Sequence, residues 1–240
     1  MGSIVGIADE RPAHNVTLRS FYLDSSEVTQ EEWVLIFGNN PSYFSENPAA
    51  GERQEKRPVE KISWYDALVY CNLRSKIEGF TPCYSIDGTS DTEQWGKVPE
   101  ISNIKWNNVT CDWDADGYRL PTESEWEYAA LMGEQEKNNS WNSDTSDNMT
   151  HETCKLRADK NGISDLYGNV WEWCWDWYTS YPVTPQENPH GPAKPDLTEG
   201  RTGRGGAWNA AASDCSLHFR NCGSPASRYN FIGLRVARNG

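Results

Sequence analysis

The last part of the chain, residues 199–240, reads EGRTGRGGAWNAAASDCSLHFRNCGSPASRYNFIGLRVARNG. Gly, Arg and apolar residues dominate its two ends, residues 204–208 and 232–236. Residues 209–231 between them contain no Lys and no Glu, and small residues there alternate with three aromatic ones. Small, adaptable groups mixed with rigid aromatic rings are typical of binding surfaces. The composition therefore indicates a binding surface held between two fixed ends or, alternatively, an ordinary surface loop.

The composition of the whole chain limits its class. Its 240 residues include 12 Trp, 11 Tyr and 6 Phe. Each aromatic side chain buries a large area, so the chain can form a core although only 37% of its residues are hydrophobic. No linker-like stretch divides it, and we expect one domain over residues 1–240.

Charge and hydropathy exclude two classes of partner. The net charge of -13 argues against nucleic acid, because binding a phosphate backbone requires concentrated Lys and Arg. No apolar run is long enough to form a transmembrane segment, and the chain does not open with a secretory signal pattern.

Local patterns predict several short elements. A capping residue followed three positions later by an acidic residue precedes an apolar stretch at Thr29–Glu32, Ser63–Asp66 and Thr122–Glu125, and each pattern predicts a helix start. Residues rich in β-formers predict strands within residues 16–23, 83–88 and 104–107, and a turn at residues 113–117. The predicted helices are separated by long, irregular connections.

Seven cysteines are distributed along the chain without the spacing of zinc ligands, at positions 71, 83, 111, 154, 174, 215 and 222. Six of them can pair and leave one over, or all can be reduced thiols. Their apolar neighbours favour buried free thiols for most of them.

Several motifs occur in the order that is found in one known family. They are DERPAHNVTL at residues 9–18, PVEKISWYDA at 58–67, YRLPTESEWEYAA at 118–130 and GNVWEW at 168–173, followed by the two ends of the closing segment. Together they resemble the formylglycine-generating-enzyme (sulfatase-modifying factor) domain over nearly the whole chain. The resemblance implies an α+β, C-type lectin fold of the formylglycine-generating-enzyme subtype. Short helices and strands, long irregular loops and an exposed site framed by the last strands are expected.

The resemblance also allows the catalytic positions to be checked. Formylglycine-generating enzymes bind copper and activate oxygen through two cysteines, and the resemblance places the first on Ala210 and the second on Cys215. A two-thiolate Cu(I) site cannot be built with alanine in one place. We therefore expect no catalysis and no catalytic cofactor. The alternative is a copper oxidoreductase that uses Cys215 and Cys222, although their spacing differs from that of the family.

A second branch of the same fold is more similar in the closing segment. The variable proteins of diversity-generating retroelements, and the treponemal type most of all, share its pattern of fixed Arg, Gly, Trp, Cys, Pro and Ile residues over 204–235. Those proteins vary the positions in between, and every residue type found there is reachable from an asparagine codon by changing adenines. The resemblance implies ligand binding by Ala210, Ala211, Ser213, Asp214, Phe219, Cys222, Gly223, Ser224, Ser227, Tyr229, Asn230 and Phe231.

This reading agrees with physical expectation. A rigid frame reduces the ordering cost of binding, and Tyr229, Phe231 and Phe219 are the expected contact anchors, although Phe219 is equally suited to a core position. The resemblance implies an unidentified surface ligand, a protein by preference. It also implies display on a bacterial cell through a lipid anchor upstream of Met1. A further alternative is a catalytically inactive structural relative that binds one fixed partner.

The resemblance finally implies a structural calcium near the GNVWEW motif. Its ligands correspond to the side chains of Asp165 and Glu172 and the carbonyl groups of Gly168 and Val170, and such oxygen ligands suit a hard cation. The alternative is that Asp165 and Glu172 cap a helix or pair with a nearby arginine.

Overall fold

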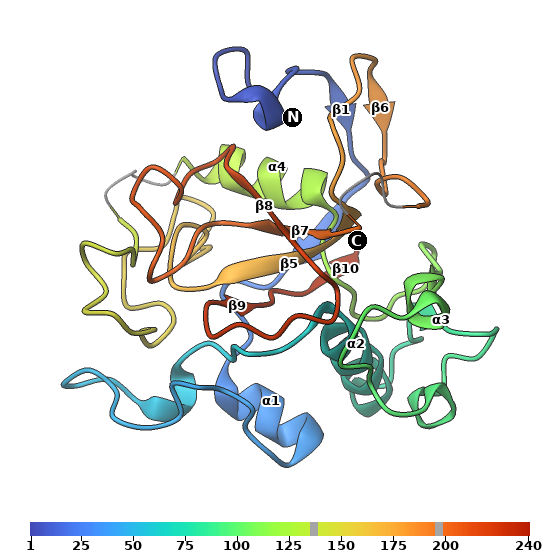
Figure 1. Ribbon diagram of the computed structural model, residues 1–240, viewed down its shortest axis with the longest axis horizontal. Helices are drawn as coiled ribbons and strands as arrows, with labels where there is room; N and C mark the ends of the chain where they lie inside the picture. Colours follow the sequence, from blue (N-terminus) through green and yellow to red (C-terminus); the bar gives the residue numbers. More distant parts are fainter. Residues whose placement is uncertain (135–138, 195–198) are drawn as a thin grey trace.

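A four-stranded sheet forms the centre of the molecule, in a computed structural model that describes residues 1–134, 139–194 and 199–240 (Figure 1). Its strands are β5 (Trp171–Trp177), β7 (Arg201–Arg204), β8 (Arg220–Gly223) and β9 (Ile232–Gly233), in the order β8-β7-β5-β9. Strand β7 is antiparallel to both neighbours, whereas β9 runs parallel to β5. The closing segment therefore supplies three of the four central strands, and the loops between them belong to the same segment.

Short strand pairs surround this sheet. Strand β1 (Val16–Thr17) pairs in parallel with β6 (Gln186–Glu187). Strand β2 (Phe21–Leu23) is antiparallel to β10 (Ala237–Asn239), which joins the first and last parts of the chain. The third pair is β3 (Tyr84–Ser85) with β4 (Thr110–Cys111). The strand predicted within 16–23 is thus divided between β1 and β2, and only two residues of 83–88 form a strand.

The three predicted helix starts are confirmed. Helices α1 (Gln30–Phe37), α2 (Trp64–Glu78) and α4 (Glu123–Gly133) begin after Thr29, Ser63 and Thr122, and each capping side chain accepts a hydrogen bond from the backbone N–H three residues later. Short 3-10 turns are η1 (Ala8–Glu10), η2 (Gln54–Lys56) and η3 (Thr92–Trp95). No helix in the described part of the chain is both long enough and apolar enough to cross a bilayer.

The strand predicted at residues 104–107 is wrong, because this stretch is the short helix α3 (Ile104–Asn107). The Asn103 side chain accepts hydrogen bonds from the N–H groups of Lys105 and Trp106 and so starts a helical turn. Trp106 is buried, while Ile104 is 74% exposed. Of the apolar residues in this stretch, only Trp106 is buried, so they do not form the buried face of a strand.

Two apolar clusters lie on either side of β5. Trp171 and Trp173 belong to the larger cluster, which includes the first turns of α2, whereas Cys174 belongs to a smaller cluster around Trp126 of α4. Successive side chains of a strand point to opposite faces, which explains this division. Figure 1 shows α4 on one side of the sheet and α1 and α2 on the other. This arrangement of helices and sheets confirms the α+β fold that the sequence predicted.

Candidate ligand-binding surface

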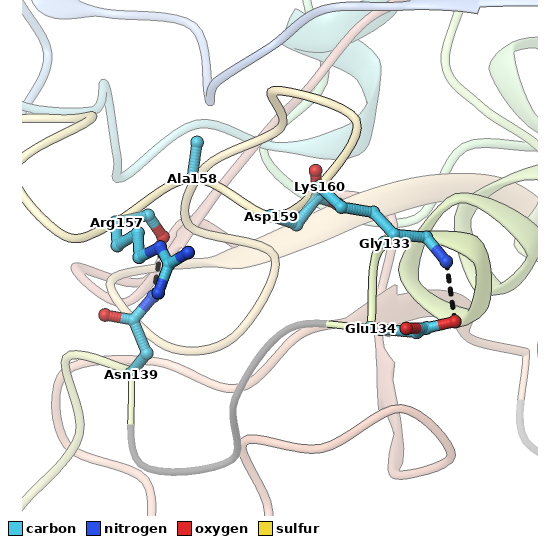
Figure 2. A pocket seen from close by; sticks show the side chains of 7 residues that line it. All are labelled: Gly133, Glu134, Asn139, Arg157, Ala158, Asp159 and Lys160. Carbon is cyan, nitrogen blue, oxygen red and sulfur yellow. Dashed lines mark hydrogen bonds and ion pairs between the residues drawn. The ribbon is translucent and has the colours of Figure 1, made fainter.

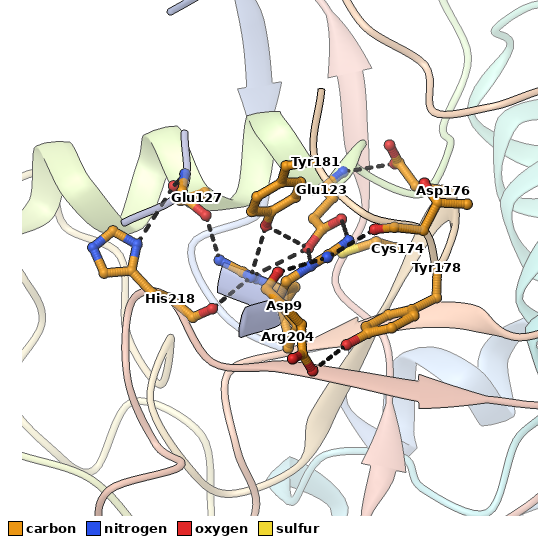
Figure 3. A network of polar contacts seen from close by, with 12 residues as sticks. Asp9, Glu123, Glu127, Cys174, Asp176, Tyr178, Tyr181, Arg204 and His218 are labelled. Atoms are coloured by element: carbon orange, nitrogen blue, oxygen red, sulfur yellow. Dashed lines mark hydrogen bonds and ion pairs between the residues drawn. The ribbon is translucent and has the colours of Figure 1, made fainter. Parts of the chain in front are cut away.

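Two buried arginines of the closing segment are held by carboxylates of α4 (Figure 3). Arg204 Nη2 lies 2.8 Å from Glu127 Oε2, and its Nη1 lies 3.2 Å from Glu123 Oε1. The same guanidinium also donates to the carbonyl groups of Leu217 and His218. Arg204 therefore ties β7 to α4 and also fixes the backbone of the loop that precedes β8.

Arg220 of β8 uses the same carboxylate. Its Nε and Nη2 donate to the two Glu123 oxygens at 2.5 and 2.7 Å, and its Nη1 donates to the carbonyl groups of Asp9 and Thr179. The Tyr181 hydroxyl donates to Glu123 Oε1 as well. Glu123 is thus the centre of a buried, hydrogen-bonded network, and such charge-assisted pairs fix geometry strongly.

The electrostatics of this network keep Glu127 ionised. Burial by itself opposes ionisation of this side chain. The nearby His218 ring and the Arg204 guanidinium outweigh burial, so the pKa of Glu127 is lowered to about 2. The carboxylate therefore retains its charge opposite Arg204 at every pH near neutrality.

A third buried arginine holds the far end of the closing segment. Arg235 forms a bidentate pair with Glu172 of β5, with its Nη2 2.7 Å from Glu172 Oε1. Its Nη2 also donates to the Ser164 carbonyl group. Trp126 Nε1 donates to the other Glu172 oxygen at 2.7 Å. Both ends of the segment are thereby anchored to β5 and α4.

Backbone contacts fix the start of the exposed loop. Gly206 has a φ of 86°, and a Cβ there would lie 2.5 Å from Cys215 Sγ, so only glycine fits without displacement. Trp208 donates its backbone N–H to the Asn169 carbonyl group and its ring N–H to the Asn230 carbonyl group. One tryptophan thus links the first and last parts of the loop.

The twelve positions predicted to contact ligand lie between these anchors, and every one of them is at least partly exposed. The anchoring residues are buried, among them Arg204, Cys215, Arg220, Ile232 and Arg235. The most exposed of the twelve are Ala211, Ser213, Ser224 and Tyr229. The loop therefore separates into a buried frame and an accessible set of side chains.

The aromatic positions differ in role. Tyr229, 48% exposed, stacks on Phe231 with ring centroids 5.0 Å apart. Phe219 packs against Trp171 at 5.9 Å, at the edge of the larger apolar cluster. Phe231 and Phe219 both pack against the larger apolar cluster, and the exposed Tyr229 ring is stacked on the one that is held there, Phe231.

Two features of this surface were not visible in the sequence. Tyr43, 63% exposed, packs edge-on against Phe44, and Phe44 packs in the same way against Trp208. Tyr43 and Phe44 are far from the closing segment in the sequence, so no local pattern predicted that they contact it. Gly223 is more restricted than expected, because a Cβ there would lie 2.7 Å from Trp173 Cη2.

The two positions that correspond to the family's copper-binding cysteines lie at the same apolar cluster, since Ala210 packs against the cluster that contains Cys215, but only one of them carries a thiol. Ala210 offers no ligand atom. Cys215 is 2% exposed in the smaller apolar cluster, and burial raises the pKa of its thiol to about 11. Cys222 lies opposite Thr202 on β7, whereas Cys215 packs against Gly206 beyond the other end of that strand. The thiols that the oxidoreductase alternative requires are thus separated along β7.

The predicted calcium ligands are placed unequally. Asp165 is buried, and burial raises the pKa of its carboxyl to about 6. Its Oδ2 accepts a hydrogen bond from the Cys154 N–H, while its buried Oδ1 has no partner among the described residues. Both Glu172 oxygens are engaged by Arg235 and Trp126. In the described ranges, no three His, Cys, Asp or Glu side chains form a group that could hold a metal ion. Of the two predicted side-chain ligands, Asp165 therefore has an oxygen without a partner among the described residues, whereas Glu172 has none to spare.

A pocket lies at the end of α4 (Figure 2). Lys160 Nζ pairs with Glu134 Oε1 at 2.6 Å across it, and Asn139 Nδ2 donates to the Arg157 carbonyl group. Arg157 and Asp159 also line the pocket, so its charged side chains include both signs.

Comparison with known proteins agrees with this geometry. The family model described as Sulfatase-modifying factor enzyme 1-like domain matches residues 1–240. The solved structure of Treponema denticola variable protein 1 is similar to this chain with a TM-score of 0.92 and 34% identity, over 100% of this chain and 91% of that one. The resemblances to this family and to a treponemal variable protein are thus confirmed.

Two further relatives show the range of the family. The Chaperone protein LppX of Paenibacillus barcinonensis is 34% identical over 94% of this chain and 82% of its own length. The Formylglycine-generating enzyme of Streptomyces coelicolor is 26% identical over 96% of this chain and 82% of its own length, so enzymes are among the relatives. With its motifs and its fold matched from end to end, the chain belongs to the sulfatase-modifying factor enzyme 1-like family.

Proposed function

We propose that this chain is a ligand-binding protein that presents residues 204–235 as a surface diversified by a retroelement, and that it has no catalytic activity. The observation that carries the proposal is the division of the closing segment. The predicted ligand positions are at least partly exposed, while the arginines that fix the backbone, Arg204, Arg220 and Arg235, are buried. Side chains at such positions can differ without disturbing the fold, except at Gly223, where a Cβ would meet the Trp173 ring.

The anchoring network supports this proposal energetically. Arg204, Arg220 and Arg235 pair with carboxylates of α4 and β5, and none of these contacts uses a side chain of the twelve predicted positions. A backbone fixed before binding loses little conformational entropy on contact with a partner. The stacked Tyr229–Phe231 pair supplies a rigid aromatic anchor of the kind that dominates protein interfaces.

The chemistry of the cysteine positions supports the absence of catalysis. Copper(I) selects thiolate ligands, and a buried thiol with a raised pKa resists conversion to thiolate. With alanine at 210 and Cys215 buried, the chain lacks the paired, accessible thiolates that this chemistry requires. The ligand is proposed to be a protein on another surface, and the chain to be displayed on a bacterial cell by a lipid anchor upstream of Met1. This part of the proposal rests on the resemblance of the closing segment to the variable proteins of diversity-generating retroelements.

Substitution of exposed positions tests the proposal. We expect a triple variant, Ala211→Asn, Ser213→Asn and Ser224→Asn, to melt within about 2 °C of the parent, because exposed substitutions change stability little. Arg220→Ala is the matched frame variant, and we expect it to lower the melting temperature by many times that shift. A triple variant that unfolds would show that these side chains are structural, and the proposal would fail.

The DNA around the gene provides an independent test of diversification. A reverse transcriptase gene and a near-copy of the codons for residues 204–235, differing only at adenines, are expected. If both are absent from the complete locus, the proposal that a retroelement diversifies this segment is wrong, and a receptor with one fixed partner becomes the better explanation.

We also propose that Asp165 helps to bind a structural calcium ion. Its buried Oδ1, which has no partner among the described residues, supports this proposal, since a buried carboxylate requires a counter-charge. Calcium would stabilise the loop before β5 and would take no part in a reaction. We expect millimolar calcium to raise the melting temperature relative to chelator, and Asp165→Asn to abolish the shift. An unchanged melting temperature in the parent protein would contradict the proposal and leave Arg235 as the cation of this region.

A further inference from the structure

Two cysteines meet where the long insertion between α2 and α4 is joined by strands. Cys83 directly precedes β3, and Cys111 is the last residue of β4. Tyr84 is the register partner of Cys111, and the Asp112 N–H donates to the Cys83 carbonyl group at 2.7 Å. Cys83 and Cys111 are therefore diagonal neighbours across one strand pair.

This placement suits a covalent bond. Strand spacing and rise put the Cα atoms of diagonal neighbours about 6 Å apart. Disulfides usually join Cα atoms separated by about 4.4–6.8 Å. The backbone holds the pair within this range. Regular alternation along a strand would point adjacent side chains to opposite faces, but Cys83 lies outside β3, and its thiol is in side-chain contact with the Cys111 thiol.

The two thiols differ in solvent exposure and in pKa. Cys83 is 1% exposed, and its Sγ donates to the Gly117 carbonyl group at 3.3 Å. Cys111 is partly exposed. The contact with the Cys111 thiol lowers the pKa of Cys83, burial opposes this, and the Arg119 guanidinium supports it, whereas burial and the contact with Cys83 raise the pKa of Cys111. One thiol is thus accessible to an oxidant, and the other is disposed to react with it afterwards.

We propose that Cys83 and Cys111 form a disulfide when the protein meets a disulfide oxidant. The Cys111 thiolate attacks one sulfur of a small disulfide such as oxidised glutathione, forms a mixed disulfide and releases one glutathione thiolate. The Cys83 thiolate then attacks the Cys111 sulfur and releases the second glutathione. The two cysteines lose two protons and two electrons, and one oxidised glutathione becomes two reduced ones.

The bond would fix the insertion onto the central sheet. Tyr84, next to Cys83, stacks on Trp175 of β5 with ring centroids 5.3 Å apart. The Tyr84 hydroxyl accepts a hydrogen bond from the Leu120 N–H, just before α4. A bond between Cys83 and Cys111 therefore closes residues 83–111 as a loop whose base is already packed. The inference stands independently of the ligand-binding proposal.

A competing pair lies close by. Cys71 of α2 is fully buried, and the neighbouring Cys83 adds to the effect of burial in raising the pKa of its thiol. Its helical position is not part of the β3–β4 pair, so we expect Cys71 to remain reduced.

The test uses the full chain with Cys154→Ser, which removes an exposed thiol that would take up glutathione. After treatment with oxidised glutathione, we expect a species two hydrogens lighter than the reduced chain, with a peptide that joins residue 83 to residue 111. Loop closure should raise the melting temperature by about 4–10 °C, reversibly on reduction. Adding Cys83→Ser or Cys111→Ser should abolish both changes, whereas adding Cys71→Ser should preserve them.

Peptide mapping of the parent sequence needs no folded variant, so a failure of Cys83→Ser to fold does not affect the test. A map that joins Cys71 to Cys83 would overturn the inference. The inference would also be overturned if treatment with oxidised glutathione left the chain at the mass of its reduced form.

Discussion

Glu123 is the residue on which the frame of the surface depends most. Its carboxylate accepts hydrogen bonds from Arg204, Arg220 and Tyr181 in a buried site. Removing one partner of a buried ion pair leaves an uncompensated charge, which is strongly unfavourable. We predict that Glu123→Gln lowers the free energy of unfolding by about 3–5 kcal/mol, measured by urea denaturation.

The exposed Glu93 provides the matched control. Glu93→Gln is expected to change the free energy of unfolding by less than about 0.5 kcal/mol, because it lies on the surface. If Glu123→Gln unfolds at the urea concentration of the parent protein, the frame does not rest on this network.

At the scale of elements, the start of α2 is coupled to the closing segment. Asp66 accepts hydrogen bonds from the N–H and hydroxyl groups of Ser63, and it also pairs with Arg228 at 2.7 and 3.1 Å. One carboxylate therefore caps a helix and holds the loop between β8 and β9. We predict that Asp66→Ala costs about 1–2 kcal/mol and speeds amide exchange in residues 226–231, measured by hydrogen–deuterium exchange.

Glu32 closes the equivalent capping box on α1 without an ion pair to the closing segment among the described contacts. Glu32→Ala should therefore cost a similar amount and leave exchange in residues 226–231 unchanged. Equal exchange in that region for both variants would refute the coupling.

At the scale of the whole molecule, buried acids set the pH dependence of stability. Burial is the largest cause that raises the pKa values of Asp176 and Glu60 to about 7 and of Asp165 to about 6. In the unfolded chain these groups ionise near pH 4. Between roughly pH 4 and 7 the folded state binds more protons, so stability falls as pH rises. Glu127 has the opposite effect. Its pKa in the folded state is about 2, so it stabilises the fold above about pH 4.5, and this stabilisation is lost as the pH falls towards 2.

We therefore predict a higher free energy of unfolding at pH 5 than at pH 7.5. Asp176 alone should account for a difference on the order of 2–3 kcal/mol, because its carboxyl group is buried and also faces Glu123 and Glu125, with Arg220 as the opposing charge. Asp176→Asn should flatten the pH profile, and the exposed Asp144→Asn should leave it unchanged. Stability that rises from pH 5 to pH 7.5 would contradict this assignment.

The sequence predicted those features whose partners lie close together in the chain. The capping boxes at Thr29, Ser63 and Thr122 were predictable because each pair lies within one helical turn. The family and its α+β fold were predictable because several motifs occur in one order. The strand expected at residues 104–107 failed because the burial of Trp106 depends on its contact with Trp95, in another segment. Local alternation contains no information about such a contact.

The sequence by itself determined that the closing segment has fixed ends and an unusual composition between them. The tertiary structure decided which residues hold those ends. Glu123 binds Arg220, which lies 97 residues later in the chain. Tyr43 packs against Phe44, and Phe44 packs against Trp208 of the closing segment. It also decided that Gly223 faces Trp173 and that Cys83 lies beside Cys111. These pairings follow from strand register and from the packing of distant segments, and no local periodicity encodes either of them.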